Sequence, residues 1–115
     1  MDARRKFGNA GEDLAARYLA DSGFRIIARQ WKNQIGEIDL VAEFGGELIF
    51  IEVKSRSSDK YGTPEEAVHA GKLAKLQMLA ESYCQVSNWN GRYRIDVIAI
   101  EFGLRPKIRH LKAVS

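Results

Sequence analysis

Two apolar runs separated by a pair of glycines dominate the hydrophobic pattern of this chain. The runs cover residues 38–42 and 48–53, and Gly45-Gly46 lies between them. This pattern predicts a strand, a tight glycine-rich turn and a returning strand. The second run is apolar at every position from residue 48 to residue 51, so it predicts a strand that is buried on both faces.

Helical and extended patterns flank this hairpin. Apolar positions recur at helical spacing from residue 7 to residue 19, which predicts a helix that ends near Gly23. Residues 24–31 alternate imperfectly between apolar and polar side chains, as is typical of an edge strand. The stretch Thr63-Pro64-Glu65-Glu66 has a cap, a proline and an acidic residue in the order that begins a helix, and the apolar stripe continues to Tyr83.

The last part of the chain predicts two further strands. The first covers residues 93–102, and the second is a short basic edge strand within residues 107–114. The basic residues Lys107, Arg109 and Lys112 on this edge are either phosphate contacts or charges that prevent pairing with another chain. The order of elements predicts one α/β domain over residues 1–115, with a mixed central sheet flanked by helices.

Charged residues also lie within the two apolar runs of this hairpin and directly after the second. Asp39 lies in its first strand, and Glu52 and Lys54 lie on one face of its second strand. Burying a charge is costly unless the charge is paired or binds a metal. Two carboxylates from adjacent strands offer the hard oxygen ligands that suit Mg²⁺ or Mn²⁺. Lys54 can orient an attacking water or offset transition-state charge in phosphodiester hydrolysis; a plain ion pair between Glu52 and Lys54 is the alternative.

These residues resemble the D…ExK core of restriction-endonuclease-like nucleases. The longer pattern, with Gly11-Glu12 followed by GEIDLVA and FIEVKSR, is similar to the bacterial YraN family, which itself resembles archaeal Holliday-junction resolvases. The resemblance covers nearly the whole chain and implies a single restriction-endonuclease-like domain. It also implies that Glu12, Asp39 and Glu52 hold a divalent ion, that Lys54 is the catalytic cation, and that DNA is the substrate.

Val53 and Glu12 extend the predicted site. Val53 lies between Glu52 and Lys54, so its main-chain carbonyl is a candidate metal ligand. Glu12 borders the packed face of the first helix, and the family resemblance places it at the metal. The alternative is a capping box with Asn9, in which Glu12 is the third residue of the helix.

Basic residues near the motif are candidate nucleic-acid contacts. Arg56 follows the motif on the face of Glu52, and Lys72 and Lys75 lie off the apolar stripe of the second helix. Basic side chains donate hydrogen bonds to phosphate oxygens, which predicts contacts to a nucleic-acid backbone. Ordinary solvated charges are the alternative interpretation.

Composition limits the classes of protein that fit. The chain of 115 residues has 45% hydrophobic and 29% charged residues, which is ordinary for one globular domain, and its net charge of +3 permits a nucleic-acid partner. Cys84 is the only cysteine, so no internal disulfide or cysteine-rich zinc site can form, and a cytoplasmic location is expected. No run of residues has the length and apolar character of a membrane span, so no membrane partner is expected.

The leading functional expectation is a metal-dependent endonuclease that acts on DNA, including branched DNA. Two other classes remain open: a nucleic-acid-binding module without cleavage, and a protein-interaction adaptor with a vestigial carboxylate site. A small domain that cuts both strands needs two active sites, so a symmetric homodimer is expected.

Overall fold

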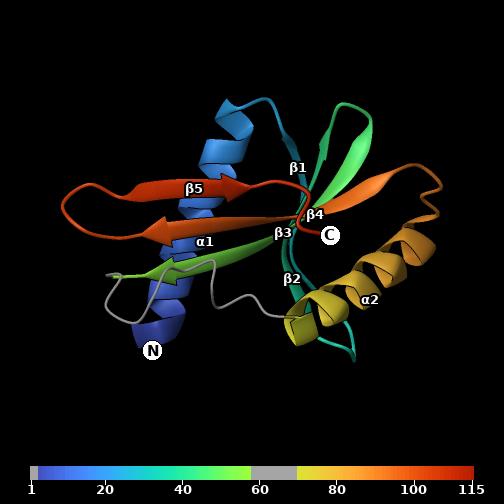
Figure 1. Ribbon diagram of the computed structural model, residues 1–115, viewed down its shortest axis with the longest axis horizontal. Coiled ribbons are helices and arrows are strands. Elements are labelled where there is room, and N and C mark those ends of the chain that lie inside the picture. The colour runs from blue at the N-terminus through green and yellow to red at the C-terminus, as the bar shows by residue number, and fades with distance from the viewer. Residues whose placement is uncertain (1–2, 58–69) are drawn as a thin grey trace.

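A five-stranded mixed sheet packed between two helices forms the fold in this computed structural model (Figure 1). The structure describes residues 3–57 and 70–115. The strands lie in the order β1-β2-β3-β4-β5; β3 and β4 are parallel and the other neighbours are antiparallel. The elements are α1 (Ala3–Asp21), β1 (Arg25–Lys32), β2 (Glu37–Phe44), β3 (Glu47–Arg56), α2 (Ala70–Ser87), β4 (Tyr93–Glu101) and β5 (Lys107–Leu111). The predicted α/β class, with a mixed central sheet flanked by helices, is confirmed.

The glycine pair forms the predicted turn between β2 and β3. Gly45 and Gly46 have φ angles of 59° and 81°, and Phe44 pairs with Glu47 across the two-residue loop. Two consecutive positive φ angles match the right-handed twist of the flanking strands, and glycine adopts them without a steric penalty. The turn therefore fixes the register of β2 against β3.

Each helix covers one face of the sheet. Buried residues of α1 and α2 form two separate apolar clusters with the strands, because β-strand side chains point alternately to opposite faces. The α1 cluster contains Ala15, Leu19, Phe24, Leu40, Ala42, Ile49, Ile51, Ile98 and Ile100. The α2 cluster contains Ile38, Val41, Leu48, Phe50, Leu76, Leu79, Ala80 and Ile95. The predicted burial of β3 on both faces is confirmed, since its apolar residues belong to both clusters.

The ends of the helices agree with their predicted signals where the structure describes them. The last residue of α1 is Asp21, and Gly23 follows with a φ angle of 94°, as expected for a glycine that terminates a helix. The apolar stripe of α2 packs as predicted, and Gly71 lies inside this helix. The predicted helix start at Thr63 lies outside the described residues.

One strand is longer than its sequence predicts. The second apolar run ends at residue 53, but β3 continues to Arg56. Ser55 and Arg56 pair with Ile100 and Glu101 of β4, so the partner strand extends β3 into polar sequence. The expected edge strands are confirmed, because β1 and β5 lie at the two ends of the strand order.

Within residues 3–57 and 70–115, neither helix is both long and apolar enough to cross a membrane.

Candidate functional site

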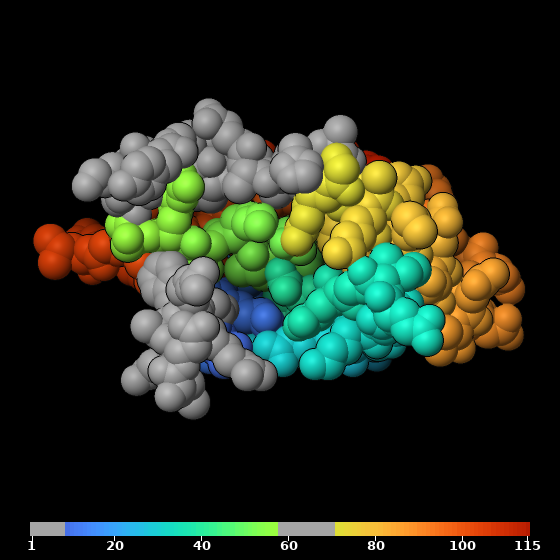
Figure 2. Space-filling model, turned by 90° about the horizontal axis from the view of Figure 1, so that it is seen from below, coloured from blue at the N-terminus to red at the C-terminus, as the bar shows by residue number. Residues whose placement is uncertain are grey.

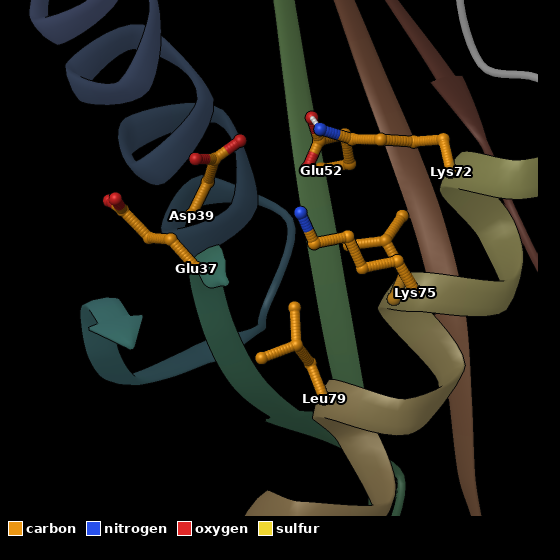
Figure 3. A pocket seen from close by; sticks show the side chains of 7 residues that line it. Glu37, Asp39, Glu52, Lys72, Lys75 and Leu79 are labelled. Carbon is orange, nitrogen blue, oxygen red and sulfur yellow. Dashed lines mark ion pairs between the residues drawn. The ribbon is translucent and has the colours of Figure 1, made fainter. Parts of the chain in front are cut away.

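A polar cavity of about 220 Å³ lies between the beginning of β2, β3 and the first turns of α2. Figure 3 shows Glu37 and Asp39 on one side of this cavity and the side chains of α2 on the other. Its lining residues are Glu37, Asp39, Glu52, Lys72, Lys75, Leu76 and Leu79. In Figure 2 the yellow beginning of α2 lies beside the turquoise beginning of β2, with green residues of β3 exposed next to both. The structure therefore brings the two predicted carboxylates, Asp39 and Glu52, to one cavity.

Asp39 lies where β2 departs from regular pairing. The ladder between β2 and β3 runs from Phe44 to Leu40 and its last pair is Leu40 with Ile51. Ile38 packs in the α2 cluster and Asp39 lines the cavity beside α2, so two consecutive side chains lie on that side of the sheet. The Val53 backbone N–H donates a hydrogen bond of 2.8 Å to Oδ2 of Asp39. A side-chain oxygen thus accepts the hydrogen bond at the point where the ladder ends.

The environment of Asp39 disfavours its negative charge. Burial, followed by the nearby charge of Glu52, raises the pKa of Asp39 from 3.8 to about 7. The Val53 hydrogen bond opposes this change, and Glu12 and Glu37 add smaller repulsion. Four carboxyl groups therefore interact in one small region, a pattern that is common in functional sites.

Glu52 is held by two lysines from different elements. Its side chain is 6% exposed, and its Oε1 atom lies 3.7 Å from Nζ of Lys54 and 3.2 Å from Nζ of Lys72. Lys54 follows Glu52 on the same face of β3, as predicted from strand alternation. Lys72 reaches the same carboxylate from α2 (Figure 3). Lys72 was expected to contact phosphate or to be an ordinary solvated charge. Its contact with Glu52 depends on how α2 packs against the sheet, and no sequence pattern indicates it.

Lys75 lines the same cavity from the next turn of α2. A Cβ atom on Gly36 would lie 2.9 Å from Cε of Lys75, so the absence of a side chain at Gly36 lets this lysine pack against the beginning of β2. Lys72 and Lys75 therefore point into the carboxylate cavity, and their contact with phosphate remains a prediction.

Glu12 approaches the site from α1. A Cβ atom on Gly11 would clash with the Ser55 side chain, so glycine permits α1 to lie closely against β3 at this point. Glu12 is 6% exposed and accepts hydrogen bonds from Nε of Arg29 at 3.3 Å and Nε2 of Gln30 at 3.4 Å. The capping-box alternative is wrong, because α1 begins at Ala3 and Glu12 lies well inside the helix.

The contacts of Arg29 and Gln30 with Glu12 were not predicted from the sequence. Both lie in β1, and Gln30 has a positive φ angle of 52°, which is unfavourable for a residue with a side chain. This conformation accompanies the contact between the Gln30 amide and Glu12. Strained backbone is often found at functional sites.

The remaining predicted residues have distinct positions. The Val53 N–H donates a hydrogen bond to Asp39, and the role of the Val53 carbonyl as a metal ligand remains a prediction. Arg56 lies at the end of β3, outside the lining of the cavity. It is partly buried, and its carbonyl accepts a hydrogen bond of 2.8 Å from the N–H of Phe102.

The donor chemistry of the cavity fits a hard divalent cation. Asp39 and Glu52 supply carboxylate oxygens, and a cation between them would offset the burial of the Asp39 charge and its repulsion by Glu52, which together raise the pKa of Asp39. Over the described residues, no three acidic, histidine or cysteine side chains are already arranged to hold one ion. Glu12 and Glu52 instead contact basic side chains, so ion binding requires Glu52 to exchange its contact with Lys72 for the metal.

A second buried polar group lies on the α1 side of the sheet. Asp96 is 0% exposed and is contacted by Nε of Arg94 at 3.0 Å and Nε2 of His110 at 2.7 Å. Nδ1 of His110 lies 3.0 Å from the Tyr18 hydroxyl. Arg94 and Asp96 are two residues apart on one face of β4, so their contact is local. The contact of His110 with Asp96 depends on the register of β5 and was not predicted.

Comparison with known proteins identifies the family. Relatives called UPF0102 protein in Rhodococcus opacus and Paenarthrobacter aurescens are both 45% identical to this chain, covering 91% and 99% of it and 92% and 97% of their own lengths. A further relative, from Symbiobacterium thermophilum, is 45% identical over 91% of this chain and 90% of its own length. Residues 11–100 match the family described as "Uncharacterised protein family UPF0102". This chain therefore belongs to the UPF0102 family.

Proposed function

We propose that this protein is a metal-dependent nuclease that acts on DNA. The observation that carries the proposal is the position of Asp39, whose pKa of about 7 results from burial beside the carboxylate of Glu52. Two buried neighbouring carboxylates lower the stability of a fold, and proteins contain them where they bind a cation or transfer a proton. Lys54 adjoins the same carboxylate and supplies the cation expected beside a reacting phosphate.

Each residue has a specific task in this proposal. Asp39 and Glu52 bind Mg²⁺ or Mn²⁺, and the bound ion would supply Lewis acidity and an activated water. The Val53 N–H orients the Asp39 carboxylate, since it donates to one of its two oxygens. Lys54 stabilises negative charge on the phosphoryl oxygens. Glu12, held by Arg29, adds negative charge near Asp39 and orients groups around the ion.

The resemblance to restriction-endonuclease-like proteins and Holliday-junction resolvases supports the same reaction class. We therefore propose a cytoplasmic enzyme that acts on linear or branched DNA. Cleavage of both strands would require two such cavities, so the proposed active form is a symmetric dimer.

The decisive experiment is cleavage of linear, flapped and four-way DNA in the presence of Mg²⁺ or Mn²⁺. We expect cleavage by the natural protein and its loss in Asp39→Asn, while the matched variant Glu43→Gln remains active. Glu43 lies on the same strand but pairs with Arg25 at 3.3 Å instead of lining the cavity. Absence of cleavage on every substrate with both metals would contradict the proposal.

A binding module without cleavage is the second candidate. It is favoured by one observation: Lys54 and Lys72 both contact Glu52, and so offset a charge that a metal would otherwise offset. This candidate predicts salt-dependent DNA binding that is unaffected by metal and by Asp39→Asn. Calorimetric titration with Mg²⁺ or Mn²⁺ separates the two candidates, because only the nuclease binds the ion through Asp39.

A further inference from the structure

The register of the sheet aligns four basic residues in two rows. Lys54 of β3 pairs with Ala99 of β4, and Ala99 pairs with Arg109 of β5. In the next row, Arg56 pairs with Glu101, and Glu101 pairs with Lys107. Directly paired residues lie on the same face of a sheet. We call Lys54, Arg56, Lys107 and Arg109 the basic track.

The alternation along β5 confirms which face carries the track. Ile108 packs against the α1 cluster, and His110 contacts Tyr18 of α1. Lys107 and Arg109 alternate with these residues and therefore point to the opposite face, which is the face of Glu52. Both are exposed.

The track carries a local excess of positive charge. Its four basic residues and the single acidic residue Glu101 give the two rows a charge of +3. Strands are spaced about 4.8 Å apart and residues two apart on a strand about 6.6 Å, so the track spans about 10 Å across the sheet. This is a compact basic surface that suits a polyanion.

The track begins at the candidate site and leads away from it. Lys54 contacts Glu52, which lines the carboxylate cavity, while Lys107 and Arg109 lie two strands away. The hairpin of β4 and β5 extends to the left of the molecule in both Figure 1 and Figure 2. The cavity and the hairpin are therefore joined by basic side chains on one face.

We infer that the basic track holds the phosphate backbone of DNA, which crosses β3, β4 and β5 on its way from the cavity. This inference rests on the proposed function and deepens it, because it states the direction in which the substrate leaves the site. The carboxylates of the cavity repel phosphate in the absence of a cation, so the backbone requires positive charge next to them. Lys72 and Lys75 line the cavity itself, whereas Lys107 and Arg109 are exposed on the sheet beyond it, so the track extends the positive charge away from the site.

The test uses a fluorescently labelled 30-base-pair duplex and anisotropy over a range of NaCl concentrations. The double variant Lys107→Gln/Arg109→Gln should bind about 10- to 50-fold more weakly at 0.1 M salt, and its slope of log affinity against log salt should fall by about two. The control, Arg17→Gln/Arg92→Gln, removes the same charge from exposed positions on α1 and before β4 and should bind like the natural protein.

A variant with increased affinity provides a second test. Glu101→Gln removes the acidic residue between Arg56 and Lys107, so DNA binding should strengthen about threefold or more. Thermal unfolding of all variants shows whether they are folded. Because Glu101→Gln should improve binding, a loss of folding cannot imitate its expected result.

The outcomes separate this inference from the proposed function. If natural protein binds and cuts DNA while the track and control variants bind equally, the inference is overturned and the nuclease stands. If binding depends on the track but no metal supports cleavage, the nuclease fails and the inference stands. If natural protein binds no DNA at any salt concentration, both fail.

Discussion

The backbone N–H of Val53 donates a hydrogen bond to the carboxylate of Asp39 over 2.8 Å, and this bond joins β3 to β2 beyond their last regular pair. The Asp39 carboxylate is thereby held at Val53, the residue that follows Glu52 in β3. Its position is determined by the sheet and not by a mobile loop, which favours precise placement of a ligand or catalytic group.

The raised pKa of Asp39 makes stability depend on pH. A carboxyl group whose pKa is raised from 3.8 to about 7 in the folded protein favours folding when protonated, and this contribution is lost as the pH rises towards 7. Asp39→Asn keeps an oxygen to accept the Val53 hydrogen bond but carries no charge. We expect it to be more stable than the natural protein by about 1–3 kcal/mol at pH 8 and nearly equal at pH 4.

Urea unfolding at both pH values, without metal, measures this difference. Glu43→Gln is the control and should show little pH-dependent difference, since Glu43 forms a surface pair with Arg25. A destabilised Asp39→Asn at pH 8 would show that the carboxylate is favourably paired in the fold.

Lys54→Met tests the catalytic cation. The change retains most of the side-chain length and removes the charge, and Glu52 keeps its closer contact with Lys72 at 3.2 Å. We therefore expect metal affinity and thermal stability close to those of the natural protein, with cleavage reduced at least 100-fold, the order of loss seen when a transition-state donor is removed. Single-turnover cleavage is the measurement, and Arg17→Met is the exposed control. Reduced stability with unchanged cleavage would identify Lys54 as a structural partner of Glu52.

Lys72 and the metal are expected to compete for Glu52. Removing the ammonium group in Lys72→Met frees the carboxylate for the ion, so Mg²⁺ or Mn²⁺ affinity should increase about threefold to tenfold, equivalent to about 1 kcal/mol. Lys75→Met is the matched control, because Lys75 lines the same cavity one turn later. Calorimetry that gives weaker binding in Lys72→Met than in Lys75→Met would indicate that Lys72 supports the ion instead.

Asp96 is expected to be a major contributor to stability. Asp96→Asn leaves Arg94 and His110 without their buried anionic partner, so unfolding should require about 3–5 kcal/mol less free energy. The control Glu47→Gln removes a more exposed carboxylate 3.6 Å from the same arginine and should cost at most about 1 kcal/mol. Equal losses in the two variants, measured by urea unfolding, would contradict the importance of burial.

The close contact between Gly11 and Ser55 predicts that a substitution at Ser55 restores stability lost by a substitution at Gly11. A methyl group in Gly11→Ala would clash with the Ser55 side chain and move α1 away from β3, at a cost of about 1–3 kcal/mol. Ser55→Gly in the same chain removes the obstructing atoms, so the double variant should recover part of this loss. A double-mutant cycle of thermal unfolding measures the coupling. Additive losses would show that the two side chains do not obstruct each other.

Features that depend on local chemistry were predictable from sequence. Gly45 and Gly46 specify their turn because few other residues accept two positive φ angles, and Glu52 and Lys54 share a face because strands alternate with a period of two. The contact between Glu52 and Lys72 was not predictable. It depends on the placement of α2 over the sheet, which a helical pattern does not specify.

The contact between His110 and Asp96 was not predictable because it depends on long-range strand register. His110 reaches Asp96 because β5 pairs with β4 so that His110 lies opposite Ile98. No local pattern in the sequence fixes that alignment. Glu12 was open to a capping interpretation because the sequence places the beginning of α1 less reliably than its packed face, and the helix begins earlier, at Ala3.

Parallel pairing between β3 and β4 has a consequence for the order of folding. The β2–β3 hairpin closes through a two-residue loop, whereas β4 joins β3 only after the crossover that contains α2. Short loops close with a smaller entropy cost, so we expect amides of the hairpin to gain protection from hydrogen exchange before those of β4 during refolding. The carboxylates of Asp39 and Glu52 would then meet early, in a solvated hairpin, and become buried together only when α2 docks.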